Sequence, residues 1–152
     1  MKRITKPDLV KLLHKISFFK KFTEEEIDRI SDVDTYVVNR TAGQHFVKEG
    51  NKEDSLYVLI KGQVYINKSS NPKAKIASLG PGSVFGDISF VNEMKRTTNV
   101  FAEIPSIALK LNHDLIVHLG PEIETKIKDE FLMILFRRLG NLNKVFFKKL
   151  KI

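Results

Sequence analysis

The sequence predicts an α+β fold: an eight-stranded, jelly-roll-like β-barrel, flanked by N-terminal and C-terminal helices, with a short helix inside residues 81–98. Three observations lead to this prediction. Apolar residues follow a helical period over 1–32, short β-rich runs separated by turn residues fill 33–111, and a helical period returns over 112–152. The length of 152 residues and the hydrophobic fraction of 42% suit a single domain, over 1–152, with a buried core.

The N-terminal segment predicts two helices. Leucine and isoleucine recur at three- and four-residue spacing from Leu9 to Ile16, which indicates one amphipathic face. Thr23 followed by Glu26 is the pattern of a capping box, in which each side chain binds the other residue's backbone N–H. A second, short helix is therefore expected to begin after Thr23.

The middle of the chain has the pattern of an all-β unit. Its β-branched and aromatic runs are short, and Gly, Asn and Pro stand at the joints between them. Closely spaced strands of this kind are typical of a sandwich or a barrel. Seven runs are strand candidates: 36–38, 45–47, 56–60, 63–66, 75–79, 98–102 and 106–111.

The C-terminal segment predicts a short helix followed by a long one. Asn112 is a suitable N-cap for a helix through Leu119, and Gly120-Pro121 ends that helix and begins the next. One apolar stripe then runs from Ile123 to Phe146, and Gly140 interrupts it at a position where the helix can bend.

The composition excludes several function classes. Without cysteine the chain has no disulfide, no thiolate nucleophile and no Cys-bearing zinc site. The four histidines do not have the spacing of a metal site, and no serine has a neighbouring histidine in the sequence. No apolar run approaches the roughly 20 residues that span a bilayer. We therefore expect a cytoplasmic protein that is not an enzyme and has no metal cofactor.

The positive charge is concentrated at the two ends of the chain. The net charge is +8, to which residues 1–21 contribute +6, residues 141–152 contribute +4, and the stretch between them contributes −2. A domain that binds nucleic acid usually carries its basic residues on one face of the folded body. We interpret the basic ends as solvated helix faces, and expect neither nucleic acid nor a membrane as partner.

The segment 81–98, here called the cassette, has the residues for binding a sugar phosphate. Gly86 permits a tight turn and a close approach of the backbone to a ligand. A helical turn from Asp87 would present unpaired N–H groups to an anion, and the guanidinium of Arg96 suits a phosphate. Thr97 adds a hydroxyl beside it, and Asp87 is an acceptor for a ligand hydroxyl.

Two motifs in this order resemble the cyclic nucleotide-binding domain of catabolite-activator-type regulators, kinase regulatory subunits and gated ion channels. The first is the phosphate-binding cassette of that family, whose glycine and arginine are ten residues apart, as are Gly86 and Arg96. The second is a Glu-Gly, Asp, Tyr and Gly signature, matched by Glu49-Gly50, Asp54, Tyr57 and Gly62. The resemblance covers nearly the whole chain.

The resemblance assigns roles to the cassette residues. It implies that Arg96 and the backbone N–H groups near Ile88 and Ser89 bind the phosphate of a 3′,5′-cyclic nucleotide. It implies that Thr97 contacts the phosphate and the base, and that Asp87 stands where the family's glutamate accepts the ribose 2′-hydroxyl. The expected binding segment is completed by Val84, Phe85 and Gly86.

Three positions depart from the family pattern. Asp87 is one methylene shorter than the usual Glu, so its carboxylate would lie about 1.5 Å farther from the ribose. Lys95 replaces the common proline before the arginine, and Thr98 replaces a small alanine. These changes bear on ligand affinity and identity more than on the fold.

The sequence leaves open which base the bound nucleotide carries and which element of the chain covers that base. Thr97 is compatible with cAMP and with cGMP. In the family the long C-terminal helix usually covers the base, so Leu139, Leu142 and Asn143 are candidate lid residues. For each of them, packing against the barrel or in a helix interface is the interpretation that we favour.

The hypothesis is a stand-alone sensor that binds cAMP or cGMP and transmits binding through its C-terminal helices to a partner protein. The long apolar stripe also suggests a homodimer through the C-terminal helix. The alternative is a degenerate domain that has lost its ligand and serves protein–protein interaction. The sensor hypothesis requires Arg96 to lie inside the β-rich shell, not neutralised by a neighbouring carboxylate.

Overall fold

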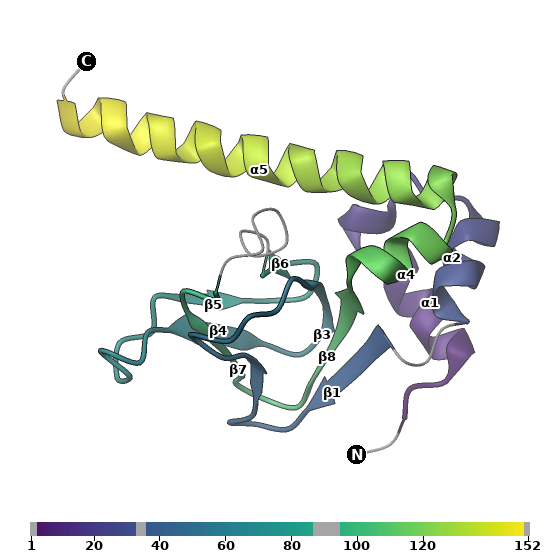
Figure 1. The fold of residues 1–152 in the computed structure, drawn as a ribbon, viewed down its shortest axis with the longest axis horizontal. Helices are drawn as coiled ribbons and strands as arrows, with labels where there is room; N and C mark the ends of the chain where they lie inside the picture. Colours follow the sequence, from purple (N-terminus) through teal and green to yellow (C-terminus); the bar gives the residue numbers. More distant parts are fainter. Residues whose placement is uncertain (1–2, 33–35, 87–94, 151–152) are drawn as a thin grey trace.

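We describe residues 3–32, 36–86 and 95–150 in a computed structural model, in which helices at both ends of the chain pack beside a β-barrel (Figure 1). The N-terminal unit consists of α1 (Lys6–His14), the 3₁₀ turn η1 (Ser17–Phe19) and α2 (Glu24–Ser31). The capping box is confirmed, since Glu26 N–H donates to Thr23 Oγ1 at 3.1 Å and Thr23 N–H donates to Glu26 Oε1 at 2.8 Å.

The barrel consists of two four-stranded antiparallel sheets with the strand orders β1-β8-β3-β6 and β2-β7-β4-β5. The eight-stranded prediction is confirmed, and each of the seven sequence runs contributes one strand. The eighth strand, β6, was not among those runs because it is only two residues long and lies within the cassette. The strands are β1 (Val37–Arg40), β2 (His45–Val47), β3 (Leu56–Lys61), β4 (Val64–Asn67), β5 (Ala77–Leu79), β6 (Val84–Phe85), β7 (Asn99–Ala102) and β8 (Ser106–Leu111).

The C-terminal segment forms the two helices that the sequence predicts, α4 (His113–His118) and α5 (Pro121–Leu150). Asn112 caps α4 by accepting a hydrogen bond from Leu115 N–H at 2.8 Å. Helix α5 continues through Gly140, so this glycine does not end the helix. Figure 1 shows α5 crossing above the barrel from the side where the N-terminal helices lie.

Strand β3 separates two apolar clusters because its side chains alternate between the two faces of the sheet. Leu56, Val58 and Ile60 belong to the cluster that joins the helices to the outside of the barrel. Tyr57 and Leu59 belong to the cluster inside the barrel. The barrel is thereby fixed to the helices by one face of a central strand, and its interior remains a separate core.

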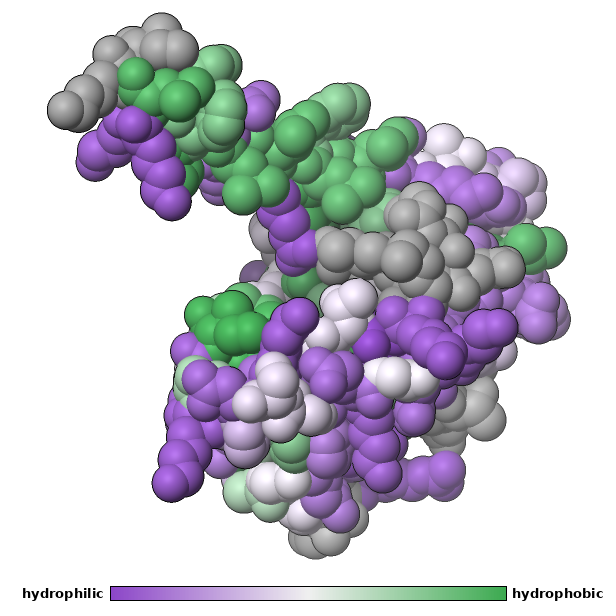
Figure 2. Space-filling view, turned by 60° about the vertical axis from the view of Figure 1, so that its left-hand side comes forward, coloured by the Kyte–Doolittle hydropathy of each residue, from purple (hydrophilic) through white to green (hydrophobic). Residues whose placement is uncertain are grey.

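The apolar stripe of α5 divides into a buried half and an exposed half. Ile123, Ile127 and Phe131 are buried in the cluster with the N-terminal helices. Leu139 and Leu142, farther along the same stripe, are 54% and 66% exposed. Figure 2 shows this part of α5 as an apolar surface that stands clear of the barrel. None of the helices in the described ranges combines the length and the hydropathy of a membrane-spanning segment.

Candidate functional site

The two sequence motifs meet at Arg96. The N–H of Gly50 donates to the Arg96 carbonyl at 2.8 Å, and the N–H of Arg96 donates to the Asn51 carbonyl at 2.9 Å. Gly50 has a φ of 86°, which favours glycine at this turn. The Glu-Gly signature therefore fixes the backbone from which the cassette arginine extends.

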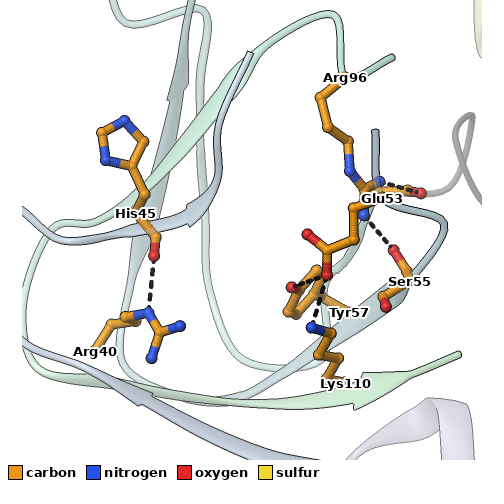
Figure 3. Close-up of polar contacts among 8 residues, drawn as sticks. Arg40, His45, Glu53, Ser55, Tyr57, Arg96 and Lys110 are labelled. Carbon is orange, nitrogen blue, oxygen red and sulfur yellow. Dashed lines mark hydrogen bonds and ion pairs between the residues drawn. The ribbon is translucent and has the colours of Figure 1, made fainter. Parts of the chain in front are cut away.

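The guanidinium of Arg96 is buried and lies between two loops (Figure 3). Nη1 donates to the Gly86 carbonyl at 2.9 Å, and Nη2 donates to the Ser55 carbonyl at 2.7 Å. Nε is also buried, and it has no hydrogen-bond partner among the described residues. The side chain is 4% exposed, so water does not readily supply the missing acceptor.

The charge of Arg96 is not neutralised by an ion pair with any carboxylate in the described parts of the chain. Burial lowers the pKa of its guanidinium, while Glu53, Tyr57 and Asp54 act in the opposite direction. An arginine remains protonated in either case. The side chain is thus a desolvated cation whose bonds are to neutral carbonyl groups, an arrangement that favours an added anion.

Gly86 is required at this point for two reasons. Its φ of +81° is one that residues with a Cβ rarely adopt. A Cβ at this position would also lie 2.8 Å from Arg96 Nη1 and 2.8 Å from the Ser55 carbonyl oxygen. The glycine thus permits the backbone to approach the guanidinium closely enough for the hydrogen bond from Nη1.

Glu53 is engaged by other groups on the Arg96 side of the barrel. The Tyr57 hydroxyl donates to Glu53 Oε1 at 2.9 Å, and Lys110 Nζ lies 2.8 Å from the same oxygen (Figure 3). Burial by itself would raise the pKa of Glu53, but the hydrogen bonds from Lys110 and Tyr57 outweigh it and lower that pKa. Lys110 and Tyr57 therefore hold the glutamate as a carboxylate, and the charge of Arg96 lowers its pKa further to a smaller extent.

Aromatic packing inside the barrel positions strand β6, which leads to Gly86. The rings of Tyr57 and Phe85 are stacked with centroids 5.1 Å apart, and Phe46 meets Phe85 edge-on at 5.7 Å. Val84 is buried on the opposite side, in the cluster that contains the helices. The side chain of Phe85 therefore packs inside the barrel, and that of Val84 packs in the cluster with the helices. This packing fixes β6 and thereby places Gly86 next to Arg96.

Comparison with known proteins identifies the domain. A profile described as the cyclic nucleotide-binding domain matches residues 37–119, which is more than half of the 152-residue chain. The chain belongs to the cyclic nucleotide-binding domain family. The domain of this family is a regulatory, non-catalytic fold, and the resemblance inferred from the two motifs is confirmed.

The chain is similar in sequence to protein kinases and in fold to solved structures. The chain is 28% identical over 128 residues to the cGMP-dependent protein kinase egl-4 of Caenorhabditis briggsae, covering 80% of this chain and 17% of the kinase. A cyclic nucleotide-binding domain from Methylobacillus flagellatus has a TM-score of 0.73 at 22% identity, covering 95% of this chain and 83% of that one. The regulatory domain of Toxoplasma gondii protein kinase A, crystallised with cAMP, has a TM-score of 0.62 at 18% identity, covering 82% and 49%.

The structure places only part of the predicted binding set. Gly86 and Arg96 are brought together, as their spacing in the family motif implies. Thr97 follows Arg96 and is exposed. The predicted residues Asp87, Ile88 and Ser89, and the short cassette helix, lie outside the described residues.

The remaining predicted residues lie in two other environments. Val84 and Phe85 are each 3% exposed, so their side chains belong to the protein core. Leu139, Leu142 and Asn143, the candidate lid residues, are exposed on the outer half of α5. Their role as a lid stays a prediction.

Sequence reasoning missed four residues of this region. Ser55 contributes its carbonyl, and Glu53 and Lys110 form the ion pair beside Arg96. Arg138 of α5 donates to the Val84 carbonyl at 2.7 Å, which connects the long helix to β6. The contact of the Ser55 carbonyl could not be found from the sequence, because every residue has a carbonyl group. Glu53 could have been found, because it lies just before Asp54 of the second motif.

The described residues of this region offer the chemistry of an anion site. No group of three or more His, Cys, Asp or Glu side chains in the described ranges could hold a metal ion. What these residues offer is a buried guanidinium with an unpaired Nε, next to a turn of the chain that only glycine permits.

Proposed function

We propose that this domain binds a 3′,5′-cyclic nucleotide, cAMP or cGMP, with the cyclic phosphate placed at Arg96. The observation that carries the proposal is the buried guanidinium with no described carboxylate partner and with Nε unpaired. Leaving a buried donor unpaired costs about 1–3 kcal/mol, and more for a charged group. A phosphate anion would supply both the missing acceptor and the missing negative charge.

The other ligand contacts are assigned by family likeness. Backbone N–H groups near Ile88 and Ser89 would bind the same phosphate, Thr97 would contact the phosphate and the base, and Asp87 would accept the ribose 2′-hydroxyl. Because Asp87 is shorter than the family's glutamate, the substitution Asp87→Glu is expected to tighten binding. An unchanged or weaker affinity would contradict this role for Asp87.

Calorimetric titration with cAMP, cGMP and 5′-AMP tests the phosphate assignment. We expect saturable binding of at least one cyclic nucleotide, and a loss of about 100-fold in affinity for Arg96→Ala, since charge-assisted hydrogen bonds are removed. Arg40→Ala is the matched control, because Arg40 also donates to two barrel carbonyls but lies elsewhere in the barrel (Figure 3). Its affinity should equal that of the wild type.

The proposal fails if neither cyclic nucleotide gives heat and if millimolar ligand leaves the melting temperature unchanged. It also fails if Arg40→Ala weakens binding as much as Arg96→Ala. Because Arg96→Ala removes the donors for two carbonyls, Arg96→Lys serves as a second variant that keeps the charge. It should bind more weakly than the wild type, because an ammonium lacks the planar fork of a guanidinium.

We propose further that binding is transmitted through α5 to a partner protein. The support is the hydrogen bond from Arg138 to the Val84 carbonyl, because Val84 lies two residues before Gly86, whose carbonyl Arg96 holds. A ligand that changes the position of Gly86 would thereby act on α5. The ligand shifts the helix only to the extent that it binds the two positions with different affinity.

The outer half of α5 supports a homodimer as one assembly state. Apart from the hydrogen bond from Arg138 to β6, this half of the helix projects past the barrel (Figure 2). Its exposed apolar side chains are Phe136, Leu139, Leu142, Val145, Phe146, Phe147 and Leu150. Sedimentation of the wild type should show a dimer, and Leu139→Glu combined with Phe146→Glu should yield a monomer. A wild type that is monomeric at all concentrations would contradict the dimer.

The second candidate function is an interaction module without a nucleotide. One observation favours it. Arg96 already donates to the carbonyls of Gly86 and Ser55, so its role can be to hold these two loops together. In that case Arg96→Ala and Arg40→Ala would both lower stability, and no variant or wild type would bind cAMP or cGMP. The calorimetric experiment therefore decides between the two functions.

A further inference from the structure

A groove lies between the N-terminal helices and the first sheet of the barrel, on residues that the nucleotide site does not use. It consists of two adjacent pockets, of about 420 Å³ and about 450 Å³. Both are lined by Leu12, Lys15 and Lys61, so the two pockets adjoin along α1. We call it the lysine groove.

The floor of the lysine groove is apolar. Ile16 and Ile60 lie at its bottom, where both side chains are buried, and Leu12 and Ile107 are partly buried along its length. Apolar surface that borders an open trough loses contact with water when a second apolar surface covers it. The floor can therefore accept apolar side chains of another segment.

The rim of the groove carries three exposed lysines, Lys11 and Lys15 from α1 and Lys61 from β3. Within the described part of the chain none of the three has an ion pair. Some lysines elsewhere in the described part of the chain do have an ion pair, as Lys75 has with Glu103 and Lys110 with Glu53. One carboxylate, that of Asp8, lines the trough beside them, so the rim is strongly positive.

One end of the groove lies beside the approach to the nucleotide site. Pro81 and Gly82 line the first pocket, and the N–H of Gly82 donates to the Leu59 carbonyl at 2.7 Å. Strand β6 begins two residues after Gly82 and leads to Gly86. A segment bound in the groove would touch the chain immediately before the cassette strand.

We propose that the lysine groove docks an acidic segment of a partner protein that carries apolar side chains. The carboxylates of the segment would pair with Lys11, Lys15 and Lys61, and its apolar side chains would cover the floor between them. A second copy of this chain fits poorly, because the chain carries a net charge of +8. The proposal does not depend on nucleotide binding.

The test uses the full chain and two fluorescein-labelled peptides of about 15 residues, a length at which an amphipathic helix can form on binding. Both peptides are rich in glutamate, one with leucines at helical spacing and one with leucines at alternating spacing. Fluorescence anisotropy should show saturable binding of at least one. Replacement of its leucines by glycine should abolish that binding, because the floor then gains no apolar contact.

Two groove variants and one control locate the binding. The charge reversal Lys11→Glu, Lys15→Glu and Lys61→Glu should weaken binding about tenfold or more. Ser17→Trp, which fills the trough from the exposed residue Ser17 without changing the charge, should also weaken it. The control Lys73→Glu, Lys144→Glu and Lys148→Glu has the same net charge and reverses exposed lysines elsewhere, so its affinity should stay close to that of the wild type.

Four results would overturn the proposal. The first is failure of both peptides to bind at millimolar concentration. The second is equal weakening in the control, which would mean diffuse attraction to a basic protein. The third is binding to phosphatidylserine vesicles without binding to either peptide, which would make the groove a membrane contact. The fourth is self-association of the wild type that Ser17→Trp abolishes, which would make a second copy the occupant.

Discussion

Two arginines of the barrel have nearly the same hydrogen bonds, and the difference between them separates a structural residue from a candidate binding residue (Figure 3). Arg40 donates from Nε to the His45 carbonyl at 2.8 Å and from Nη1 to the Asn39 carbonyl at 2.9 Å. Arg96 also donates to two carbonyls, but from Nη1 and Nη2, so that its buried Nε has no acceptor among the residues that the structure describes.

The glycines near the two arginines, Gly43 and Gly86, also differ in how much space surrounds them. Gly43, in the turn between β1 and β2, has a φ of 86° and nothing within 4 Å of the place where a Cβ would be. Gly86 has a similar φ but is crowded by Arg96 and Ser55. The turn at Gly43 needs glycine only for its positive φ. The turn at Gly86 needs glycine for its positive φ and for the absence of a Cβ. The two arginines make the same number of hydrogen bonds. The candidate site is distinguished by the Arg96 Nε, which has no partner among the described residues, and by the crowding at Gly86.

The largest expected effect comes from adding a methyl group at each turn. Gly86→Ala combines an unfavourable φ with overpacking against Arg96 and Ser55, and should lower the free energy of unfolding by about 2–4 kcal/mol. Gly43→Ala meets the φ penalty alone and should cost about 1–2 kcal/mol. Urea denaturation of both variants measures the difference. Equal losses would show that the Gly86 turn relaxes and that its crowding is unimportant.

A smaller effect concerns the carboxylate beside Arg96. Because Lys110 and Tyr57 lower the pKa of Glu53 in the folded state, the unfolded state binds the proton more tightly. The stabilisation is thus fully present above the ordinary value of 4.5, and it is lost as the pH falls through the lower folded value. Glu53→Gln should cost about 0.5–1 kcal/mol at pH 7, given partial exposure of the pair.

The same variant has a defined pH signature and a control. The difference in unfolding free energy between wild type and Glu53→Gln should shrink when urea denaturation is repeated at decreasing pH below 4.5. Glu103→Gln removes an ion pair of the same 2.8 Å separation with Lys75, which is 52% exposed, and should cost less at pH 7. A Glu53→Gln difference that is independent of pH would contradict the assignment.

An effect of similar size concerns the connection between α5 and β6. Arg138→Ala removes the hydrogen bond to the Val84 carbonyl and should cost about 0.5–1.5 kcal/mol. It should also speed amide hydrogen exchange in the outer half of α5. Arg137→Ala, the neighbouring exposed arginine, should change the stability by less than about 0.5 kcal/mol. Equal exchange in the two variants would mean that Arg138 does not hold the helix.

Sequence patterns were most informative where a local rule decides the structure. The capping box at Thr23, the cap at Asn112 and the strand of His45–Val47 were all predicted with their correct residues. Strand β6 was missed because two residues show no period, and it exists because Phe85 and Val84 fill two different cores. The apolar stripe predicted one long helix, but not that only the first half of that helix packs against the N-terminal helices.

The order of helices, barrel and helices was determined by the sequence, because hydrophobic period and caps are local properties. That Gly86 and Arg96 belong to one segment was implied by the family motif, and their hydrogen bond is a finding of the structure. The tertiary structure alone decided that the Arg96 guanidinium donates hydrogen bonds to neutral carbonyls and that Glu53 forms its ion pair with Lys110. These contacts join residues up to 57 positions apart, and the free energy of a buried charge depends on all the groups folded around it.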